Sequence, residues 1–83
     1  MKVTVKYFAS IREAIGQGSE LRDTRVTTLA ALRDELLAAS PAHAASLARG
    51  RSVRMALNQV MCDETAVLSE GCEVAFFPPV TGG

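Results

Sequence analysis

Two short apolar segments at opposite ends of the chain constrain its fold more than any other feature. The side chains that alternate onto one face of these segments, residues 2–9 and 73–77, are Val3, Val5, Tyr7, Val74 and Phe76. Because successive side chains of a strand point to opposite faces, each segment is predicted to be a strand with one buried face. These are the most apolar faces in the chain, so we expect the two strands to lie side by side in the middle of a mixed sheet.

One longer helix is predicted between these two strands. Its apolar stripe consists of Leu29, Leu32, Leu36 and Ala39, with Leu37 beside it. Thr27 suits the N-cap position, and Pro41 is expected to end the helix. A single stripe packs one face of a helix against a sheet, which leaves Arg33 on the outer side.

Shorter elements fill the rest of the chain. Ser10 and Glu13 form an S-x-x-E capping box, which predicts a short helix that continues through Ile15 and ends at Gly16. The other predicted elements are strands at residues 19–25, 52–57 and 60–62, a short helix at residues 41–49, and a tight turn at Asn58-Gln59. This order predicts an α+β fold in which one main helix packs across a mixed sheet.

Length and composition fit one domain with a tail. The chain has 83 residues, and its hydrophobic content of 48% is enough for a core. We expect residues 1–77 to form the domain and residues 78–83 to form an extended tail. No apolar segment approaches the length of about 20 residues that crosses a bilayer, and the alternation after Met1 does not match a signal peptide. The sequence therefore predicts a cytoplasmic protein with no membrane contact.

The charge balance argues against a nucleic-acid partner. Nine basic and nine acidic residues cancel, so the chain lacks the basic footprint of a nucleic-acid-binding protein. Arg49, Arg51 and Arg54 form one local basic cluster, which we interpret as a solvated loop and strand edge.

No internal group of residues has the pattern of a catalytic or metal site. Cys62 and Cys72 are not spaced as metal ligands, so no metal site is predicted, and both are expected to be small packing or edge residues. His43 is the only histidine and has no acidic neighbour in sequence, so we expect it at the surface or at a helix end. These negative results direct attention to the C-terminus.

The last six residues suit a chemical group that is presented to another protein. Pro78 and Pro79 favour an extended path, and the four residues after them reach roughly 13 Å at about 3.3 Å each. Gly82 and Gly83 have no Cβ, so they fit a narrow channel. A carboxylate is a poor electrophile, so the terminal carboxylate of Gly83 would need activation, for instance adenylation with ATP. A frayed glycine end is the alternative that these residues alone leave open.

Three segments resemble one known family. The run from Glu73 to Gly83, which ends in FFPPVTGG, looks like the C-terminus of the small subunit of molybdopterin synthase, the MoaD family. The opening from Val5 to Glu13 and the stretch Ala56-Leu57-Asn58-Gln59 are also similar to that family. The resemblance implies a β-grasp, or ubiquitin-like, sulfur carrier.

The resemblance also implies a reaction sequence and partners. An E1-like adenylating enzyme would use ATP to activate Gly83 as an acyl-adenylate, and a sulfurtransferase step would convert it to a thiocarboxylate, with Gly82 as the slim residue behind it. The tail would then enter the large synthase subunit, within a heterotetramer, and give its sulfur to cyclic pyranopterin monophosphate to form the molybdopterin dithiolene. The catalytic pocket is expected on the large subunit, and no cofactor is expected to stay bound to this chain.

Phe8 falls on the polar face of the first strand. The residues alone leave open whether it joins a small cluster under a loop or contacts a partner. If the first and last strands are neighbours, Phe8 and Phe77 meet on the outer face, with Met61 alongside, and form a docking site at the root of the tail. The partner-binding residues predicted in this way are Phe8, Met61, Phe77, Pro78, Pro79, Val80 and Thr81.

Other functions stay open beside the molybdopterin one. The chain could be a sulfur carrier for another pathway, such as a thiamin-type carrier, or a ubiquitin-like protein modifier. It could also be an interaction module whose Gly-Gly end has no chemical role. The Phe-Phe-Pro-Pro-Val-Thr stretch favours the molybdopterin carrier over thiamin carriers, which are usually shorter and approach their glycines differently.

Overall fold

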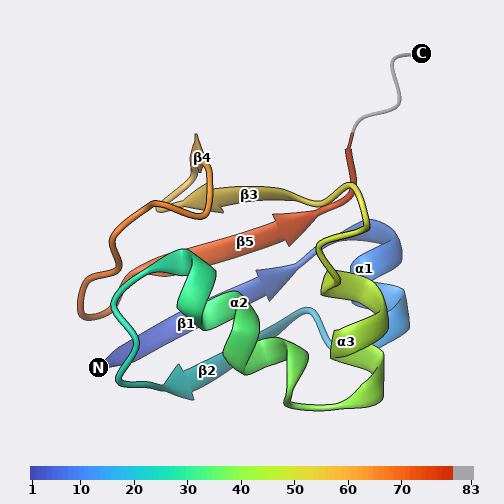
Figure 1. Ribbon diagram of the computed structural model, residues 1–83, viewed down its shortest axis with the longest axis horizontal. Helices are drawn as coiled ribbons and strands as arrows, with labels where there is room; N and C mark the ends of the chain where they lie inside the picture. The colour runs from blue at the N-terminus through green and yellow to red at the C-terminus, as the bar shows by residue number, and fades with distance from the viewer. Residues whose placement is uncertain (80–83) are drawn as a thin grey trace.

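A computed structural model describes residues 1–79 of the chain (Figure 1). Within these residues the chain forms five strands and three helices. In chain order they are β1 (Lys2–Tyr7), α1 (Ala9–Ile15), β2 (Ser19–Asp23), α2 (Leu29–Leu37), α3 (Pro41–Leu47), β3 (Arg54–Leu57), β4 (Val60–Cys62) and β5 (Glu73–Phe77). The predicted order of elements is confirmed.

The strands form one mixed sheet in the order β2-β1-β5-β3-β4. β1 and β5 are parallel, with Val5 opposite Val74 and Tyr7 opposite Phe76, so the predicted adjacency of the first and last strands is confirmed. The other pairs, β1 with β2, β3 with β4 and β3 with β5, are antiparallel. A parallel pair needs a crossover connection, and the long segment that contains α2 supplies part of it.

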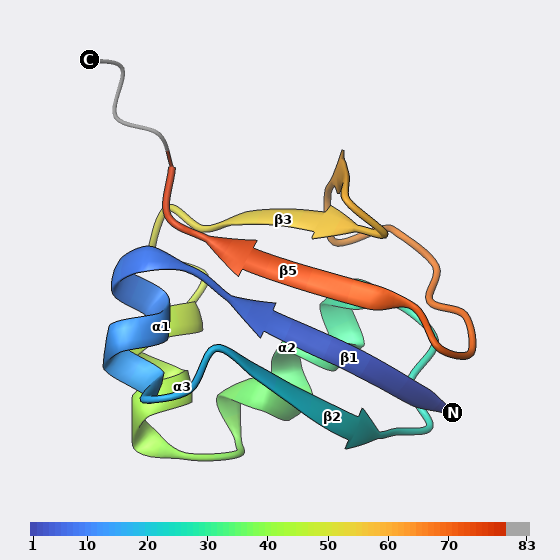
Figure 2. The ribbon, with the colours of Figure 1, turned by 180° about the vertical axis from the view of Figure 1, so that it is seen from behind.

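The two faces of the sheet differ in what lies over them. α2 passes across one face, and Figure 2 shows the opposite face, over which no helix of the described chain passes. We call these the covered face and the uncovered face. The largest buried side chains, all between the covered face and the helices, are Val3, Val5, Tyr7, Leu29, Leu32, Leu36, Leu47, Val74 and Phe76. The predicted stripe of α2 is confirmed except at Ala39, which follows the helix and is exposed.

The start of α2 and one of its polar residues differ from the prediction. The N-cap is Thr28, one residue later than predicted, and its hydroxyl accepts a hydrogen bond from the Ala31 backbone N–H at 3.2 Å. Arg33 is buried, so its predicted place on the outer side is wrong. Its guanidinium donates hydrogen bonds to the carbonyls of Leu47 at 2.7 Å and Ala48 at 3.1 Å. Arg33 therefore satisfies carbonyls at the end of α3, which a helix leaves without internal partners.

The connection from β1 to α1 also differs from the predicted capping box. The strand ends at Tyr7, Phe8 is the N-cap without a side-chain cap bond, and Ser10 already lies in the helix. Ala9 has a φ of 51°, in the left-handed region that alanine rarely adopts. The helix ends at Gly16 as predicted, where φ is 91°. The chain thus turns sharply at Phe8 and Ala9, and this turn presents the Phe8 ring at the end of the sheet.

A tight turn joins β3 to β4. Asn58 and Gln59 have φ angles of 50° and 68°, the pattern of a two-residue hairpin turn, so the predicted turn is confirmed. The Asn58 side-chain oxygen accepts a hydrogen bond from the Glu73 backbone N–H at 2.9 Å. The turn is therefore tied to the start of β5, the strand that leads to the tail.

Candidate functional site

The tail leaves the domain from a firmly held strand end. Phe76 is completely buried, and its ring stacks on that of Tyr7 with centroids 6.3 Å apart. The Phe8 backbone N–H donates a hydrogen bond to the Phe76 carbonyl at 3.2 Å. Pro78 and Pro79 follow directly, at the end of the sheet where α1 lies (Figure 1). The exit point of the tail is therefore fixed by the core.

Phe8 and Phe77 meet at this exit, as predicted. Their ring centroids lie 6.4 Å apart with an interplanar angle of 83°, an edge-to-face contact. The contact follows from the parallel register, because Tyr7 is opposite Phe76 and the next residue of each chain points away from the core. Phe8 keeps 46% of its surface exposed, so the pair offers an apolar surface to a partner.

Met61 lies on the same uncovered face but farther from the tail. Met61, in β4, pairs with Ala56 of β3, and Ala56 pairs with Ala75 of β5. Both alanines are buried, while Met61 is 53% exposed. Two small side chains therefore separate Met61 from the aromatic pair of Phe8 and Phe77.

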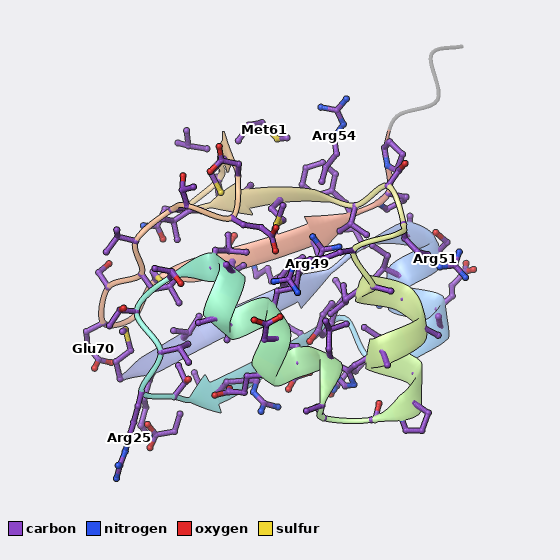
Figure 3. The ribbon with its side chains drawn as sticks, in the orientation of Figure 1. Arg25, Arg49, Arg51, Arg54, Met61 and Glu70 are labelled. Carbon is purple, nitrogen blue, oxygen red and sulfur yellow. The ribbon has the colours of Figure 1, made fainter. Side chains whose placement is uncertain are left out.

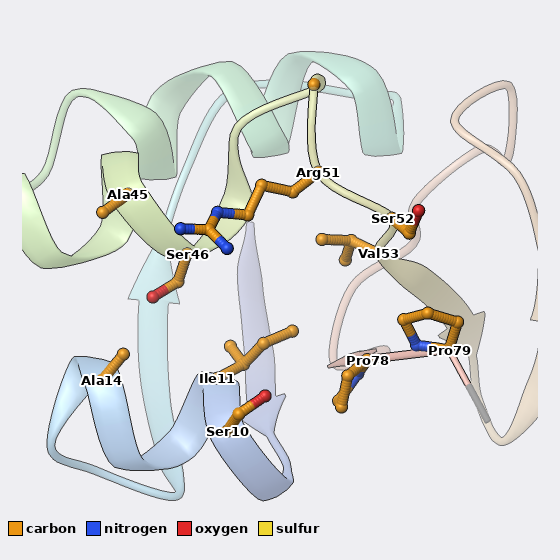
Figure 4. Close-up of a pocket in the computed structure, with 11 residues that line it drawn as sticks. Ser10, Ile11, Ala14, Ala45, Ser46, Arg51, Ser52, Val53, Pro78 and Pro79 are labelled. Carbon is orange, nitrogen blue, oxygen red and sulfur yellow. The ribbon is translucent and has the colours of Figure 1, made fainter. Parts of the chain in front are cut away.

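A groove of about 710 Å³ lies beside the root of the tail (Figure 4). Pro78 and Pro79 form one side, and residues of α1, α3 and the loop before β3 form the others. Figure 4 shows the Arg51 side chain reaching into it, toward Ser46. The sequence did not predict this groove, because its walls come from segments that are distant in the chain. The only local signal was the arginine cluster at residues 49–54.

That arginine cluster is divided in the folded chain. Arg49 forms ion pairs with Asp34 and with Glu64, the latter at 2.8 Å. Arg51 and Arg54 are exposed beside the tail instead, as Figure 3 shows. All three arginines are exposed, as the predicted solvated position requires, but the Arg49 guanidinium also joins the α2 region to the loop after β4.

A partly buried network of polar side chains joins β1, β2 and α3 on the covered face of the sheet. His43 Nε2 lies 2.9 Å from a carboxylate oxygen of Glu20, to which the Tyr7 hydroxyl donates a hydrogen bond at 2.8 Å. Arg22 forms an ion pair with the other oxygen of Glu20 at 3.1 Å. His43 lies in the first turn of α3, so the predicted helix-end position is confirmed, but its side chain is only 8% exposed and is not at the surface. The reason is that Glu20 is close in space although it is distant in sequence.

The network shifts the pKa values of its members. Burial alone would raise the pKa of the Glu20 carboxyl, but hydrogen bonds from His43, Tyr7 and Arg22 lower it below the usual range. Burial, reinforced by the hydrogen bond to Glu20, strongly raises the pKa of the Tyr7 hydroxyl. A carboxylate held ionised by several donors is suited to joining elements, here β1 and β2 to α3, and it lies on the opposite side of the sheet from the Phe8–Phe77 contact.

Within residues 1–79, neither a group of metal ligands nor an activated Cys62 thiol is present. No group of histidine, cysteine or acidic residues within residues 1–79 is arranged to hold a metal ion. Burial, with the nearby Asp63 carboxylate, raises the pKa of the Cys62 thiol, which keeps it in the less nucleophilic protonated form. In the same part of the chain, no helix has the length and apolar character needed to cross a membrane.

Four predicted site residues lie outside the described part of the chain. They are Val80, Thr81, Gly82 and Gly83. The predictions for these residues remain predictions, whereas Phe8, Met61, Phe77, Pro78 and Pro79 lie within the described residues.

The mixed sheet, with α2 across one face, defines a β-grasp, or ubiquitin-like, protein. SAMP1 from Haloferax volcanii has a similar solved structure, with a TM-score of 0.81 and 25% identity over 100% of both chains. A chain in the complex of subunits 1 and 2 of the molybdopterin-converting factor from Helicobacter pylori 26695 is also similar, with a TM-score of 0.71 and 25% identity over 100% of both chains.

Sequence comparison identifies the family. The model of the ThiS family matches residues 5–83, and the chain belongs to this family. It is 38% identical to the molybdopterin synthase sulfur carrier subunit of Escherichia coli (strain K12) over 81 residues, which cover 98% of this chain and 99% of that protein.

Proposed function

We propose that this chain is the sulfur carrier subunit of a molybdopterin synthase. Its relative in Escherichia coli bears that name and matches nearly the full length of both proteins. The observation that carries the proposal is the position of the tail exit. The parallel pairing of β1 and β5 brings Phe8 against Phe77 directly before Pro78 and Pro79, at the start of a segment that ends in Gly82-Gly83.

The reactive group is the terminal carboxylate of Gly83. An oxygen of this carboxylate bonds to the α-phosphorus of ATP, and pyrophosphate leaves. The terminal sulfur of a persulfide on the sulfurtransferase then attacks the acyl carbon, and AMP leaves to give an acyl disulfide. A second thiol attacks the sulfurtransferase sulfur of this disulfide, which leaves a disulfide on the sulfurtransferase and releases the thiocarboxylate of Gly83. This thiocarboxylate donates its sulfur to cyclic pyranopterin monophosphate, and water restores the carboxylate. Residues without side chains suit these steps, because Gly82 and Gly83 can pass through narrow channels in two different partners.

The proposed partners are an E1-like adenylating enzyme, a sulfurtransferase and the large subunit of the synthase. The similar chain from Helicobacter pylori was solved in a complex of subunits 1 and 2. The exposed Phe8 ring and its neighbour Phe77 supply the apolar anchor that such interfaces use. The proposed setting of this exchange is the cytoplasm.

The decisive experiment combines mass spectrometry with a deletion. The chain is co-expressed with its adenylating enzyme and a sulfurtransferase, and its intact mass is expected to rise by the difference between sulfur and oxygen. Deletion of Gly83 is expected to abolish this rise and also the synthesis of molybdopterin with the large subunit. A Leu21→Ala variant is the control, because Leu21 is 65% exposed on β2 at the far edge of the sheet. Full activity without Gly83 would exclude the carrier function.

A protein modifier is the second candidate, because a similar structure is that of SAMP1, a small archaeal modifier protein. In that function the activated Gly83 would form an amide with a lysine of another protein. Conjugates of higher mass that carry the Gly-Gly remnant on lysine would support it. Their absence in cells that make molybdopterin with this chain would exclude it.

A further inference from the structure

Two arginines, Arg51 and Arg54, lie at the root of the tail. Arg22, Arg33 and Arg49 each form an ion pair with a carboxylate of the domain. Arg51 and Arg54 are exposed, and no carboxylate in residues 1–79 forms an ion pair with either of them. Two cations are therefore kept in solvent beside the one segment that is proposed to enter other proteins.

Both arginines line grooves that meet at Pro79. Arg51 lies in the groove of about 710 Å³ between α1, α3 and the tail. Arg54 lies in a second groove of about 390 Å³, which extends from Pro79 to Met61. Ser52 and Val53 line both grooves. The two grooves thus form one continuous surface around the exit of the tail.

This surface carries a net positive charge. Among residues 1–79, its only charged lining residues are Arg51 and Arg54, although the chain as a whole is neutral. The other lining side chains are apolar or are hydroxyls, such as Ile11, Val53 and Ser46. A surface of this kind complements carboxylates flanked by apolar side chains, because guanidinium groups bind carboxylates with two parallel hydrogen bonds.

We propose that Arg51 and Arg54 bind carboxylates of a segment of the large synthase subunit, which lies in the two grooves when the tail is inserted. Arg54 is opposite Phe77 in the pairing of β3 and β5, so this basic surface continues the proposed aromatic docking site. Two cations on a neutral domain are too few for a nucleic-acid site, which needs many phosphate contacts. This docking assignment rests on the proposed function.

Charge reversal tests the assignment. The affinity of the large subunit for the purified chain is measured for wild type and for the double variant Arg51→Glu/Arg54→Glu. Lys2→Glu/Arg25→Glu is the control, because it changes the net charge equally and its two cations lie at the opposite end of β1, as Figure 3 shows for Arg25. We expect the double variant to bind about tenfold more weakly and with a weaker dependence on salt. The control is expected to bind like wild type, and thermal unfolding checks that both variants fold.

Cross-linking tests whether carboxylates lie beside these positions. In Arg51→Lys and Arg54→Lys, a carbodiimide can join the new amine to an adjacent carboxylate as an amide, with loss of water. We expect one covalent adduct of the two subunits at each position, located by mass spectrometry. Arg25→Lys provides the matched control at the far end of the domain and is expected to give no adduct.

The outcomes separate this inference from the proposed function. Equal affinity of wild type and the double variant, or no adduct at residues 51 and 54, would overturn the docking assignment alone. A loss of affinity for the adenylating enzyme but not for the large subunit would overturn the choice of partner. If wild type itself bound neither protein and gained no sulfur, the proposed function would fail and this inference with it.

Discussion

Phe76 and Phe77 are neighbours in β5, yet their surroundings differ completely. Phe76 points to the covered face, is fully buried and stacks on Tyr7. Phe77 points to the uncovered face, is only partly buried and contacts Phe8 edge to face. The same residue type thus serves two purposes at adjacent positions, because the strand sends successive side chains to opposite faces.

The difference between the faces separates stability from recognition. Leu and Val side chains fill the covered face to exclude water, and truncation there leaves a cavity. The uncovered face next to the tail has small buried alanines, Ala56 and Ala75, bordered by large exposed side chains. Such a surface contributes little to folding, so its apolar area is available for a partner.

The largest effect is expected for Phe76→Ala. The loss of a fully buried ring should lower the free energy of unfolding by about 3–5 kcal/mol, because the packed surroundings cannot close the cavity. Urea denaturation measures this loss. A loss below about 1 kcal/mol would contradict the assignment of Phe76 as the anchor of the tail.

The matched change on the other face is Phe77→Ala. We expect the free energy of unfolding to fall by only about 1 kcal/mol, while the affinity for the large subunit falls at least about tenfold. Calorimetric titration measures this affinity. Leu21→Ala is the control, because Leu21 lies on the same face and is 65% exposed, but it belongs to β2 at the far edge. Unchanged binding by Phe77→Ala would remove the aromatic docking site from the proposal.

A smaller effect is expected on the pH dependence of stability, and it arises from Glu20 on the covered face. The pKa of Glu20 is lower in the folded chain than its ordinary value of 4.5. Its contribution to stability is therefore present above pH 4.5 and is lost as the pH falls through the lower, folded-state pKa. We expect Glu20→Gln to cost about 1.5 kcal/mol near neutral pH and to flatten the loss of stability in acid.

Denaturation at neutral pH and at about pH 3 measures this dependence. Glu13→Gln, at an exposed position of α1, serves as the control and should retain the acid dependence of wild type. If Glu20→Gln kept the same acid dependence, the network around His43 could not be its source.

The smallest effect is expected at the turn that presents Phe8. Ala9 holds a φ of 51°, which costs alanine free energy and costs glycine almost none. Ala9→Gly should therefore raise the free energy of unfolding by about 0.5 kcal/mol. Ala14→Gly, later in the same helix, should lower it by about 1 kcal/mol instead. Equal losses in both variants would show that Ala9 is not strained.

The elements and the aromatic part of the candidate site could be predicted from sequence. Alternation identified β1 and β5, helical spacing identified α2, and the pairing of β1 with β5 brought Phe8 to Phe77. The capping box at Ser10 was wrong because the chain turns two residues earlier, at Phe8, to dock α1 against the end of the sheet. Local patterns indicate that a helix is present, but they do not show the tertiary packing that decides its first residue.

The polar contacts could not be predicted. Arg33 was expected outside, but α3 brings the Leu47 and Ala48 carbonyls to it and makes burial favourable. His43 was expected at the surface or at a helix end. It lies in the first turn of α3, but the fold buries it by placing Glu20 at its Nε2. In both residues a polar group is buried because a distant segment satisfies its hydrogen bonds, and sequence spacing contains no information about that partner.

The sequence by itself determined the properties that depend on neighbouring residues. These are the buried and outward faces of β1 and β5, the stiff Pro78-Pro79 segment, and a C-terminus that consists of two glycines. The tertiary structure alone decided which distant residues meet. It separated Arg49, which is paired within the fold, from Arg51 and Arg54, which remain beside the tail. The physical reason is that backbone preferences act over a few residues, whereas contacts between side chains depend on strand register and helix packing across the whole domain.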